Sequence, residues 1–481
     1  MNYKMILTTL GKTMLIIGVV LLVPMAVGFI YGENTWLSFL VPMLSLFAIG
    51  LPLTFLKTEE KAIHAREGFI IVVAVWLIIS LFGCLPFIIS GSIPSFVDAF
   101  FETVSGFTTT GASILNEVES LPKSLLFWRS FTHFLGGMGV LVFVLIIIPT
   151  GEGFMHVFRA ESPGPSVGKL VSKLKFTARI LYAIYCVLTL ILFVLLLICG
   201  MPVFDSICHA FGTAGTGGFS VKNTGIMFYD SVAIEMVISV FMVLFSINFS
   251  LFYLILIGSA GKAFKSEELR AFIIILIVSI IAIAINLTHT VYATFWESLR
   301  YSFFQVAAIS STTGFASANF DLWPTFSKLI LMFLMVVGAC AGSTGGGMKV
   351  SRLAILTKSS VGDLKKLIRP RSVVSVKFEG EPLAPETVTT VRNYLWLWFV
   401  LLCISTILIS LQGFGDLTTN LSAAITTLGN VGPGFNEVGP IMNFSGYSAF
   451  SKIVLSINML AGRLEIFPLI ILFMPSTWKK V

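Results

Sequence analysis

The chain has 481 residues, of which 56% are hydrophobic and only 11% are charged. Soluble proteins carry about a quarter charged residues. The composition therefore predicts a polytopic membrane protein and excludes a cytosolic enzyme, a nucleic-acid binder and a secreted disulfide scaffold. The net charge is +7, but in a membrane chain the position of each basic residue is more informative than the sum.

Ten apolar segments are long enough to cross about 30 Å of hydrocarbon. In chain order they lie near residues 13–31, 36–56, 68–90, 125–149, 180–201, 231–258, 271–288, 326–347, 393–412 and 450–475. With a cytoplasmic amino terminus, 24 of the 31 Lys and Arg residues fall in inner segments. Since Lys and Arg accumulate on the cytoplasmic side, we predict that both termini are cytoplasmic. The first segment has no cleavage site behind it and is interpreted as a retained helix.

Four outer loops share one order of features, and each lies between two predicted spans. An acidic residue is followed by a short stretch of helical character and then by a cluster of Thr, Asn and Gly. The acids are Asp98, Asp205, Glu297 and Asp416, and the clusters are Thr108–Ser113, Gly215–Ser220, Ser311–Ser317 and Asn430–Phe435. One such cluster would be ordinary loop composition. Recurrence in four equivalent places favours a repeated unit of helix, re-entrant loop and helix.

This pattern suits a binding site for a monovalent cation. Irregular backbone at membrane depth is tolerated where it lines a cavity or is buried in protein, and glycine allows close backbone approach and positive φ. Four such loops around one axis can form a ring of carbonyl oxygens that replaces the hydration shell of an ion. The residues predicted to form the ring are Thr110, Gly111, Gly217, Gly218, Thr313, Gly314, Val431 and Gly432. The alternatives for the key glycine are Gly217 in the second loop and Gly434 in the fourth.

Together with four further motifs, these loops resemble the TrkH/TrkG/KtrB family of potassium transporters over nearly the whole chain. The motifs are Leu135–Gly139, Glu161–Pro165, Gly342–Gly347 and Leu460–Glu465. Two spans ahead of the first unit favour the TrkH pattern over the shorter KtrB pattern. The resemblance implies uptake of K⁺ as the transported ion, no covalent cofactor, a homodimer, and regulation by a cytosolic nucleotide-binding ring of the TrkA type.

The eighth span is interrupted by glycines, including Gly345, Gly346 and Gly347, which can break a helix. The resemblance implies a flexible loop that obstructs the pore below the filter and moves on activation. The alternative is close helix packing through small residues.

Arg463 lies about 20 Å along the last span at 1.5 Å per residue, and an arginine at such depth is a functional-site hypothesis. We expect Arg463 to face the conduction path, where it repels cations or holds the glycine loop closed. The alternative is a structural ion pair with another span. Glu465, two residues on, does not share its helix face. Arg463 and Glu465 form the only deep ionisable cluster that the sequence predicts.

The predicted fold is therefore an all-α polytopic membrane protein with four helix–pore-loop–helix repeats around a pseudo-fourfold pore. We expect two leading helices at 1–66 and pore repeats at 67–150, 151–258, 259–350 and 351–481, the second and fourth beginning with cytoplasmic connectors. Lys365, Lys366, Arg369 and Arg371, in the last connector, suit anionic lipid or a docking surface for the cytosolic ring equally well.

The predicted function is selective K⁺ uptake across the plasma (inner) membrane, without enzyme activity and without a nucleic-acid partner. The alternative is a Na⁺- or H⁺-coupled secondary transporter, which predicts inverted repeats and ionisable groups at the midplane.

Overall fold

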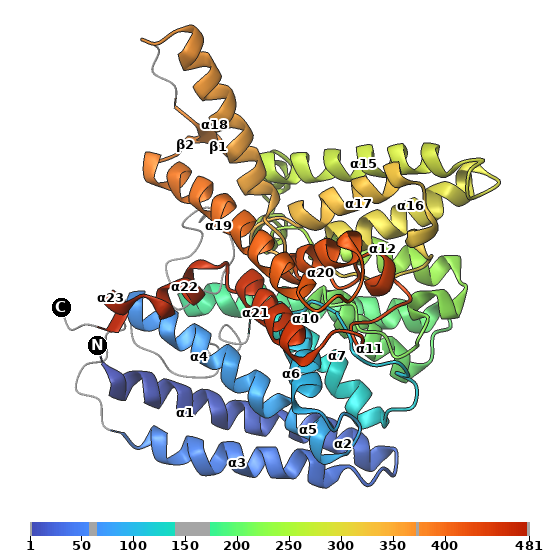
Figure 1. Cartoon of the computed structure of the whole chain (residues 1–481), viewed down its shortest axis with the longest axis vertical. Coiled ribbons are helices and arrows are strands. Elements are labelled where there is room, and N and C mark those ends of the chain that lie inside the picture. Colours follow the sequence, from blue (N-terminus) through green and yellow to red (C-terminus); the bar gives the residue numbers. More distant parts are fainter. Residues whose placement is uncertain (1, 57–64, 140–173, 372–374, 479–481) are drawn as a thin grey trace.

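The computed structural model describes residues 2–56, 65–139, 174–371 and 375–478 (Figure 1). Almost all regular structure is helical, which confirms the predicted all-α class. Part of the predicted span at 125–149 and the Glu161–Pro165 motif lie outside the described residues. Helix α1 begins and helix α23 (Pro475–Trp478) ends on the same side of the molecule (Figure 1).

The two leading spans form an antiparallel pair at one edge of the molecule (Figure 1). Helices α1 (Tyr3–Val20) and α2 (Leu22–Ile30) form the first, and α3 (Trp36–Thr54) forms the second. The pair crosses at two glycines. A Cβ on Gly11 would lie 2.7 Å from the Leu53 Cβ and 2.8 Å from the Gly50 carbonyl oxygen, so small residues allow the close backbone approach.

Four units of outer helix, pore helix and inner helix make up the rest of the membrane body. The first is α4 (Ala65–Gly83) continued by α5 (Leu85–Ile89), then α6 (Phe96–Phe107) and α7 (Lys123–Gly137). The second is α10 (Leu174–Ile198), α11 (Val203–Gly215) and α12 (Val232–Phe245). The third is α15 (Glu267–Leu287), α16 (Phe295–Ser310) and α17 (Thr325–Val337). The fourth is α19 (Pro385–Ser410), α20 (Leu417–Gly429) and α21 (Ala449–Arg463).

The four units close into a ring. Each pore helix packs between the outer and inner helices of its own unit. It also packs against the inner helix of the preceding unit, in the pairs α7–α11, α12–α16, α17–α20 and α21–α6. Because the fourth unit returns to the first, the pore helices surround one pseudo-fourfold axis, as the sequence predicts.

Three of the predicted spans are broken rather than continuous. Helix α12 turns by 91° into α13 (Phe249–Leu256), which is followed by α14 (Ala260–Phe264). Helix α21 turns by 118° into α22 (Phe467–Phe473). The predicted span at 326–347 is helical only to Val337, because Gly338 adopts a φ of +69° and begins an irregular segment that ends at Lys349.

That segment continues into α18 (Val350–Ile368), which projects from the body beside α19 (Figure 1). A two-stranded hairpin, β1 (Lys377–Phe378) and β2 (Glu381–Pro382), lies at the base of this projection. The exposed end of α18 carries both apolar and basic residues. They are Leu364, Leu367 and Ile368 with Lys365, Lys366 and Arg369.

Long apolar helices with exposed hydrophobic side chains identify a multi-pass membrane protein. Six described helices or continuous helix pairs are long and apolar enough to span a bilayer, and eight are if each bent pair counts as one span. Side chains such as Leu44, Ile274, Val278 and Ile407 are about half exposed or more on these helices, as expected for surfaces that face lipid.

The α1–α3 crossing predicts a difference between two glycines of one helix. Gly11→Ala should lower the thermal stability of the purified protein by about 1–3 kcal/mol, because the new methyl group overpacks a close backbone contact. Gly18→Ala is the matched control, since a Cβ there meets nothing nearer than 3.5 Å. Thermal unfolding of the purified protein in detergent measures the stability of both variants. Equal melting temperatures for the two variants would contradict a close helix crossing at Gly11.

Candidate functional site: a ring of backbone carbonyls

The four pore helices end where the predicted clusters begin, and each cluster has the same backbone shape. The first residue of this shape is left-handed: Thr109 (φ 54°), Thr216 (56°), Thr312 (60°) and Asn430 (53°). Two residues later comes a glycine with positive φ: Gly111 (81°), Gly218 (77°), Gly314 (75°) and Gly432 (105°). The fourfold pattern is therefore present in the main chain as well as in the sequence.

The four loops touch one another in a cycle through these glycines. A Cβ added to Gly111 would overlap the carbonyl oxygen of Gly217, and one added to Gly218 would overlap that of Thr313. The cycle continues from Gly314 to the Val431 oxygen and returns from Gly432 to the Thr110 oxygen, 2.7 Å from the added Cβ. All eight residues named from the sequence thus lie in one ring, in which each carbonyl excludes a side chain on the neighbouring glycine.

Helix ends supply the electrostatics of this ring. Asp98, Asp205 and Glu297 lie in the first turn of their pore helices and Asp416 is the N-cap of α20, as the acid spacing predicts. The opposite, carboxyl ends of all four helices lead directly into the ring. Because a helix carboxyl end carries partial negative charge, the ring is favourable for a cation and unfavourable for an anion.

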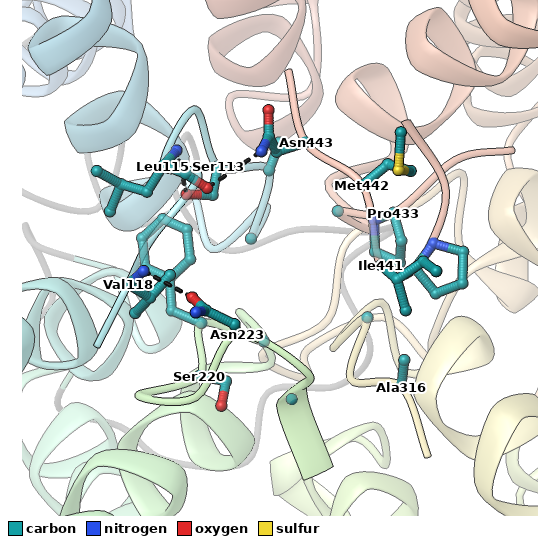
Figure 2. A pocket seen from close by; sticks show the side chains of 18 of the residues that line it. Ser113, Leu115, Val118, Ser220, Asn223, Ala316, Pro433, Ile441, Met442 and Asn443 are labelled. Carbon is teal, nitrogen blue, oxygen red and sulfur yellow. Dashed lines mark hydrogen bonds between the residues drawn. The ribbon is translucent and has the colours of Figure 1, made fainter. Parts of the chain in front are cut away.

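A pocket of about 170 Å³ lies against the ring and is lined by all four glycines. Its rim ties together loops from different units, as Figure 2 shows. The Val118 N–H donates to Asn223 Oδ1 (2.7 Å), and Asn443 Nδ2 donates to the Leu115 carbonyl (3.2 Å). The rim therefore holds loops of the first, second and fourth units at fixed positions around an open vestibule.

A surface ion pair lies beside this vestibule. Lys222, which lines the pocket, donates to Glu119 Oε2 at 3.1 Å. This hydrogen bond holds the pKa of the Glu119 carboxyl below its ordinary value, because it favours the carboxylate form.

The four left-handed residues form a second layer, called here the lower tier, between the carboxyl ends of the pore helices and the ring glycines. The role of this layer was not predicted from the sequence. A β-branched residue with positive φ is a genuine outlier and marks stored strain. Thr109 and Thr312 turn their hydroxyls to groups below the ring: Thr312 Oγ1 accepts the Gly346 N–H at 2.6 Å, and Thr109 Oγ1 accepts from Arg463 at 3.2 Å. The available signal was the Thr, Thr, Thr and Asn found two residues before the four glycines.

The irregular residues 338–349 are called the 338–349 segment below. This segment lies directly against the left-handed residues, on the side away from the ring glycines. A Cβ on Gly345 would lie 2.8 Å from the Ser311 oxygen, and one on Gly346 would lie 2.5 Å from the Gly429 oxygen. The Gly347 N–H donates to the same Gly429 oxygen at 2.8 Å. The three consecutive glycines thus face the ends of α16 and α20.

The same segment explains the bend between α12 and α13. Its Cys340 N–H donates to the Ser246 carbonyl at 3.1 Å, and its Gly342 carbonyl accepts the Phe249 N–H at 3.0 Å. Main-chain groups freed by the bend are satisfied by the inserted segment. The broken third and second inner helices therefore interlock.

Arg463, the last residue of α21, contacts three elements at once. One guanidinium nitrogen donates to Thr109 Oγ1 and to the Thr344 carbonyl (2.9 Å). The other donates to the carbonyls of Gly136 and Gly137, at the end of α7. The side chain therefore joins the lower tier, the 338–349 segment and the first inner helix. Glu465 instead pairs with Arg352 at 2.5 Å.

The prediction that Arg463 and Glu465 form the only deep ionisable cluster is wrong. Glu102 and Arg129 form a buried ion pair behind the ring, and Glu268 and Lys349 are buried at the 338–349 segment. The sequence alone did not indicate that Arg129 is paired and buried, but its side chain is only 2% exposed. The reason is that its partner, Glu102, lies on a re-entrant helix rather than on a span, so hydropathy alone does not bring the two together.

Comparison with known proteins agrees with this architecture. A model of the TrkH family, described as a cation transport protein, matches residues 38–480. The chain belongs to the TrkH family. Members of this family are transport proteins, in agreement with the prediction that the chain is not an enzyme.

Curated relatives match along the full length. The "Trk system potassium uptake protein TrkH" of Salmonella typhimurium is 34% identical, with 100% of both chains covered, and that of Escherichia coli K12 has the same values. The E. coli "Trk system potassium uptake protein TrkG" is 33% identical over 95% of each chain. The crystal structure of the potassium transporter TrkH from Vibrio parahaemolyticus covers both chains fully with a TM-score of 0.90 at 33% identity.

Proposed function

We propose that this chain carries K⁺ into the cell through the carbonyl ring formed by Thr110–Gly111, Gly217–Gly218, Thr313–Gly314 and Val431–Gly432. The observation that carries the proposal is the cyclic contact between the four loops, because it sets four carbonyl oxygens around a common axis. Such a ring can replace the hydration shell of a monovalent cation without covalent chemistry or a bound cofactor. The names of the relatives, which are potassium uptake proteins, support K⁺ as the substrate.

The coupled secondary transporter is the less favoured candidate. It requires inverted repeats with ionisable groups at the binding site, whereas the four units here run in the same order around one axis. Glu102 and Arg129 are buried, and their side chains are bonded to protein groups.

We further propose that the 338–349 segment, with Gly345, Gly346 and Gly347, is a gate beneath the filter and that Arg463 holds it closed. The supporting contacts are the Arg463 bond to the Thr344 carbonyl and the Thr312 bond to the Gly346 N–H. Opening would require both bonds to break and the segment to move away from the ends of α16 and α20. Glycine at three consecutive positions allows that change of backbone angles.

The proposal places the protein in the plasma (inner) membrane with both termini cytoplasmic, in accord with the distribution of Lys and Arg. The projecting α18 then lies on the cytoplasmic side. Its exposed apolar and basic residues suit protein contacts, so a second copy of this chain and a cytosolic nucleotide-binding ring of the TrkA type are the proposed partners. The naming of the relatives as parts of a "Trk system" supports further components.

The filter proposal predicts the behaviour of glycine variants. Gly111→Ser, Gly218→Ser and Gly314→Ser should reduce the preference for K⁺ over Na⁺ in rubidium uptake by proteoliposomes, because the side chain displaces a neighbouring carbonyl. Gly432→Ser should have the mildest effect, since an added Cβ there has the most room of the four. Gly261→Ser, where a Cβ meets nothing within 4 Å, is the control. Wild-type competition profiles in all four variants would show that the ring is not the filter.

The gate proposal predicts a gain of flux. Arg463→Gln should raise rubidium uptake by about tenfold or more, since one hydrogen bond to a charged group contributes about 1.5–3 kcal/mol. Arg463 could limit uptake by holding the 338–349 segment in place or by repelling cations through its charge. Arg463→Lys separates these two mechanisms, because lysine keeps the charge but lacks the forked geometry. Increased uptake in Arg463→Lys indicates loss of the tie, and unchanged uptake indicates charge repulsion alone.

Thr312→Val tests the second hydrogen bond that holds the proposed gate, because it removes the acceptor of the Gly346 N–H. It should raise uptake, whereas the control Thr189→Val should not, since the Thr189 hydroxyl lies on the outer helix α10 and donates to the Tyr185 carbonyl of the same helix at 2.7 Å. Unchanged or reduced uptake in both Thr312→Val and Arg463→Gln would refute the assignment of the 338–349 segment as the gate.

A further inference from the structure

Each pore helix carries at least one buried polar side chain that bonds its own loop just after the ring glycine, on the arm of the loop that leads away from the ring. In three units it stands nine residues before the ring glycine, at Glu102, His209 and Gln305, and in the fourth it is Ser422, one position earlier. All four are buried, with at most 1% exposure. These residues, called braces here, were not singled out by any sequence motif.

The braces use different chemistry for the same contact. Glu102 accepts the Ile114 N–H at 3.0 Å, and Ser422 Oγ accepts the Phe435 N–H at 3.0 Å. His209 Nε2 lies 3.1 Å from Ser220 Oγ. Gln305, in the amide orientation that satisfies its surroundings, accepts the Ser317 and Ala318 N–H groups at 2.8 and 3.2 Å. Every bonded group lies two to four residues after the ring glycine, so each brace sets the height and direction of one arm.

The brace of the first unit, Glu102, is linked through Arg129 to a second loop. Arg129 Nε donates to Glu102 Oε1 at 2.8 Å, and the side chains of the pair are 2% and 0% exposed. Arg129 also donates to the Ser220 carbonyl at 3.2 Å, and its guanidinium lies 4.1 Å from the centre of the Phe219 ring. Phe219 and Ser220 directly follow Gly218, so this ion pair joins the arms of the first and second loops.

From this geometry we infer that Glu102 and Arg129 are positioning residues for ion selectivity, acting through the filter arms without touching the ion. The inference rests on the proposed filter. Discrimination between cations of different size requires that the carbonyls resist closing around the smaller ion. A charge-assisted, forked tie is stronger and more directional than a neutral hydrogen bond. The pair therefore makes the half of the ring built by loops 1 and 2 the stiffer half.

A double variant isolates the tie between the loops. Glu102→Gln with Arg129→Met reproduces the chemistry of the third unit, which has Gln305 as its brace and apolar residues such as Leu331 and Met332 on its inner helix. The amide still bonds the first arm, but the link to Ser220 and Phe219 is lost. Because both charges are removed together, no buried charge is left unpaired.

The matched control is Glu235→Gln with Arg300→Met. Arg300 binds Glu235 in a forked arrangement at 2.6 and 2.9 Å, between α12 and α16, and neither residue belongs to a filter arm. Both double variants are compared with the wild type for thermal stability and for inhibition of rubidium uptake by K⁺ and Na⁺. We expect the Glu102/Arg129 variant to lose about tenfold in preference for K⁺ over Na⁺, the size of one charged hydrogen bond, and the control to keep the wild-type profile.

A wild-type competition profile in the folded Glu102/Arg129 variant would overturn the inference. Should that variant fail to fold, Arg129→Lys provides the same test, since it keeps the charge beside Glu102 but lacks the fork that reaches Ser220. Unchanged preference in Arg129→Lys would likewise overturn it. The glycine variants separate the two proposals: altered selectivity there with unaltered brace variants rejects the braces alone, and unaltered selectivity in both sets rejects the filter.

Discussion

The close approach of four loop backbones around one axis is the constraint on which the rest of the structure depends. Each ring carbonyl occupies the space that a side chain on the next glycine would need. The loops therefore reach their positions only if glycine stands at the four equivalent places and if every loop is held in register. The cyclic packing of pore helices against the preceding inner helices sets that register from outside. The hydrogen bonds at the pocket rim and the braces fix the register of the loops through contacts of the loops themselves.

The ring is symmetric in its backbone but not in its surroundings. The left-handed position holds Thr in three units and Asn in the fourth, where Asn430 Nδ2 bonds both Thr110 Oγ1 and the Met459 carbonyl. The tier below the ring is equally uneven, since Arg463 reaches the first loop and Gly346 reaches the third. These differences give each quarter of the ring its own support, and they allow the proposed gate and the proposed filter to be joined at particular quarters rather than uniformly.

Much of the fold follows from patterns that are local in sequence. Apolar runs placed the spans, acid spacing placed the starts of the pore helices, and the run from Gly338 to Gly347 placed the break in the third inner helix. The partners of buried charges could not be predicted in this way, because they are far apart in the chain: Arg463 and Thr109 are separated by 354 residues, and Arg129 and Ser220 by 91. The bend after Phe245 was missed for a similar reason, since its freed main-chain groups are satisfied by a segment nearly a hundred residues later.

In the proposed function, a monovalent cation is dehydrated by the carbonyls of Thr110, Gly217, Thr313 and Val431. The most direct measurement is anomalous diffraction from crystals of the protein soaked in rubidium or thallium salts. We expect anomalous density on the pseudo-fourfold axis, between these four oxygens, and we expect it to weaken when K⁺ is added in excess. Ordered cation density elsewhere in the membrane body, with none at the ring, would show that the ring is not the cation site.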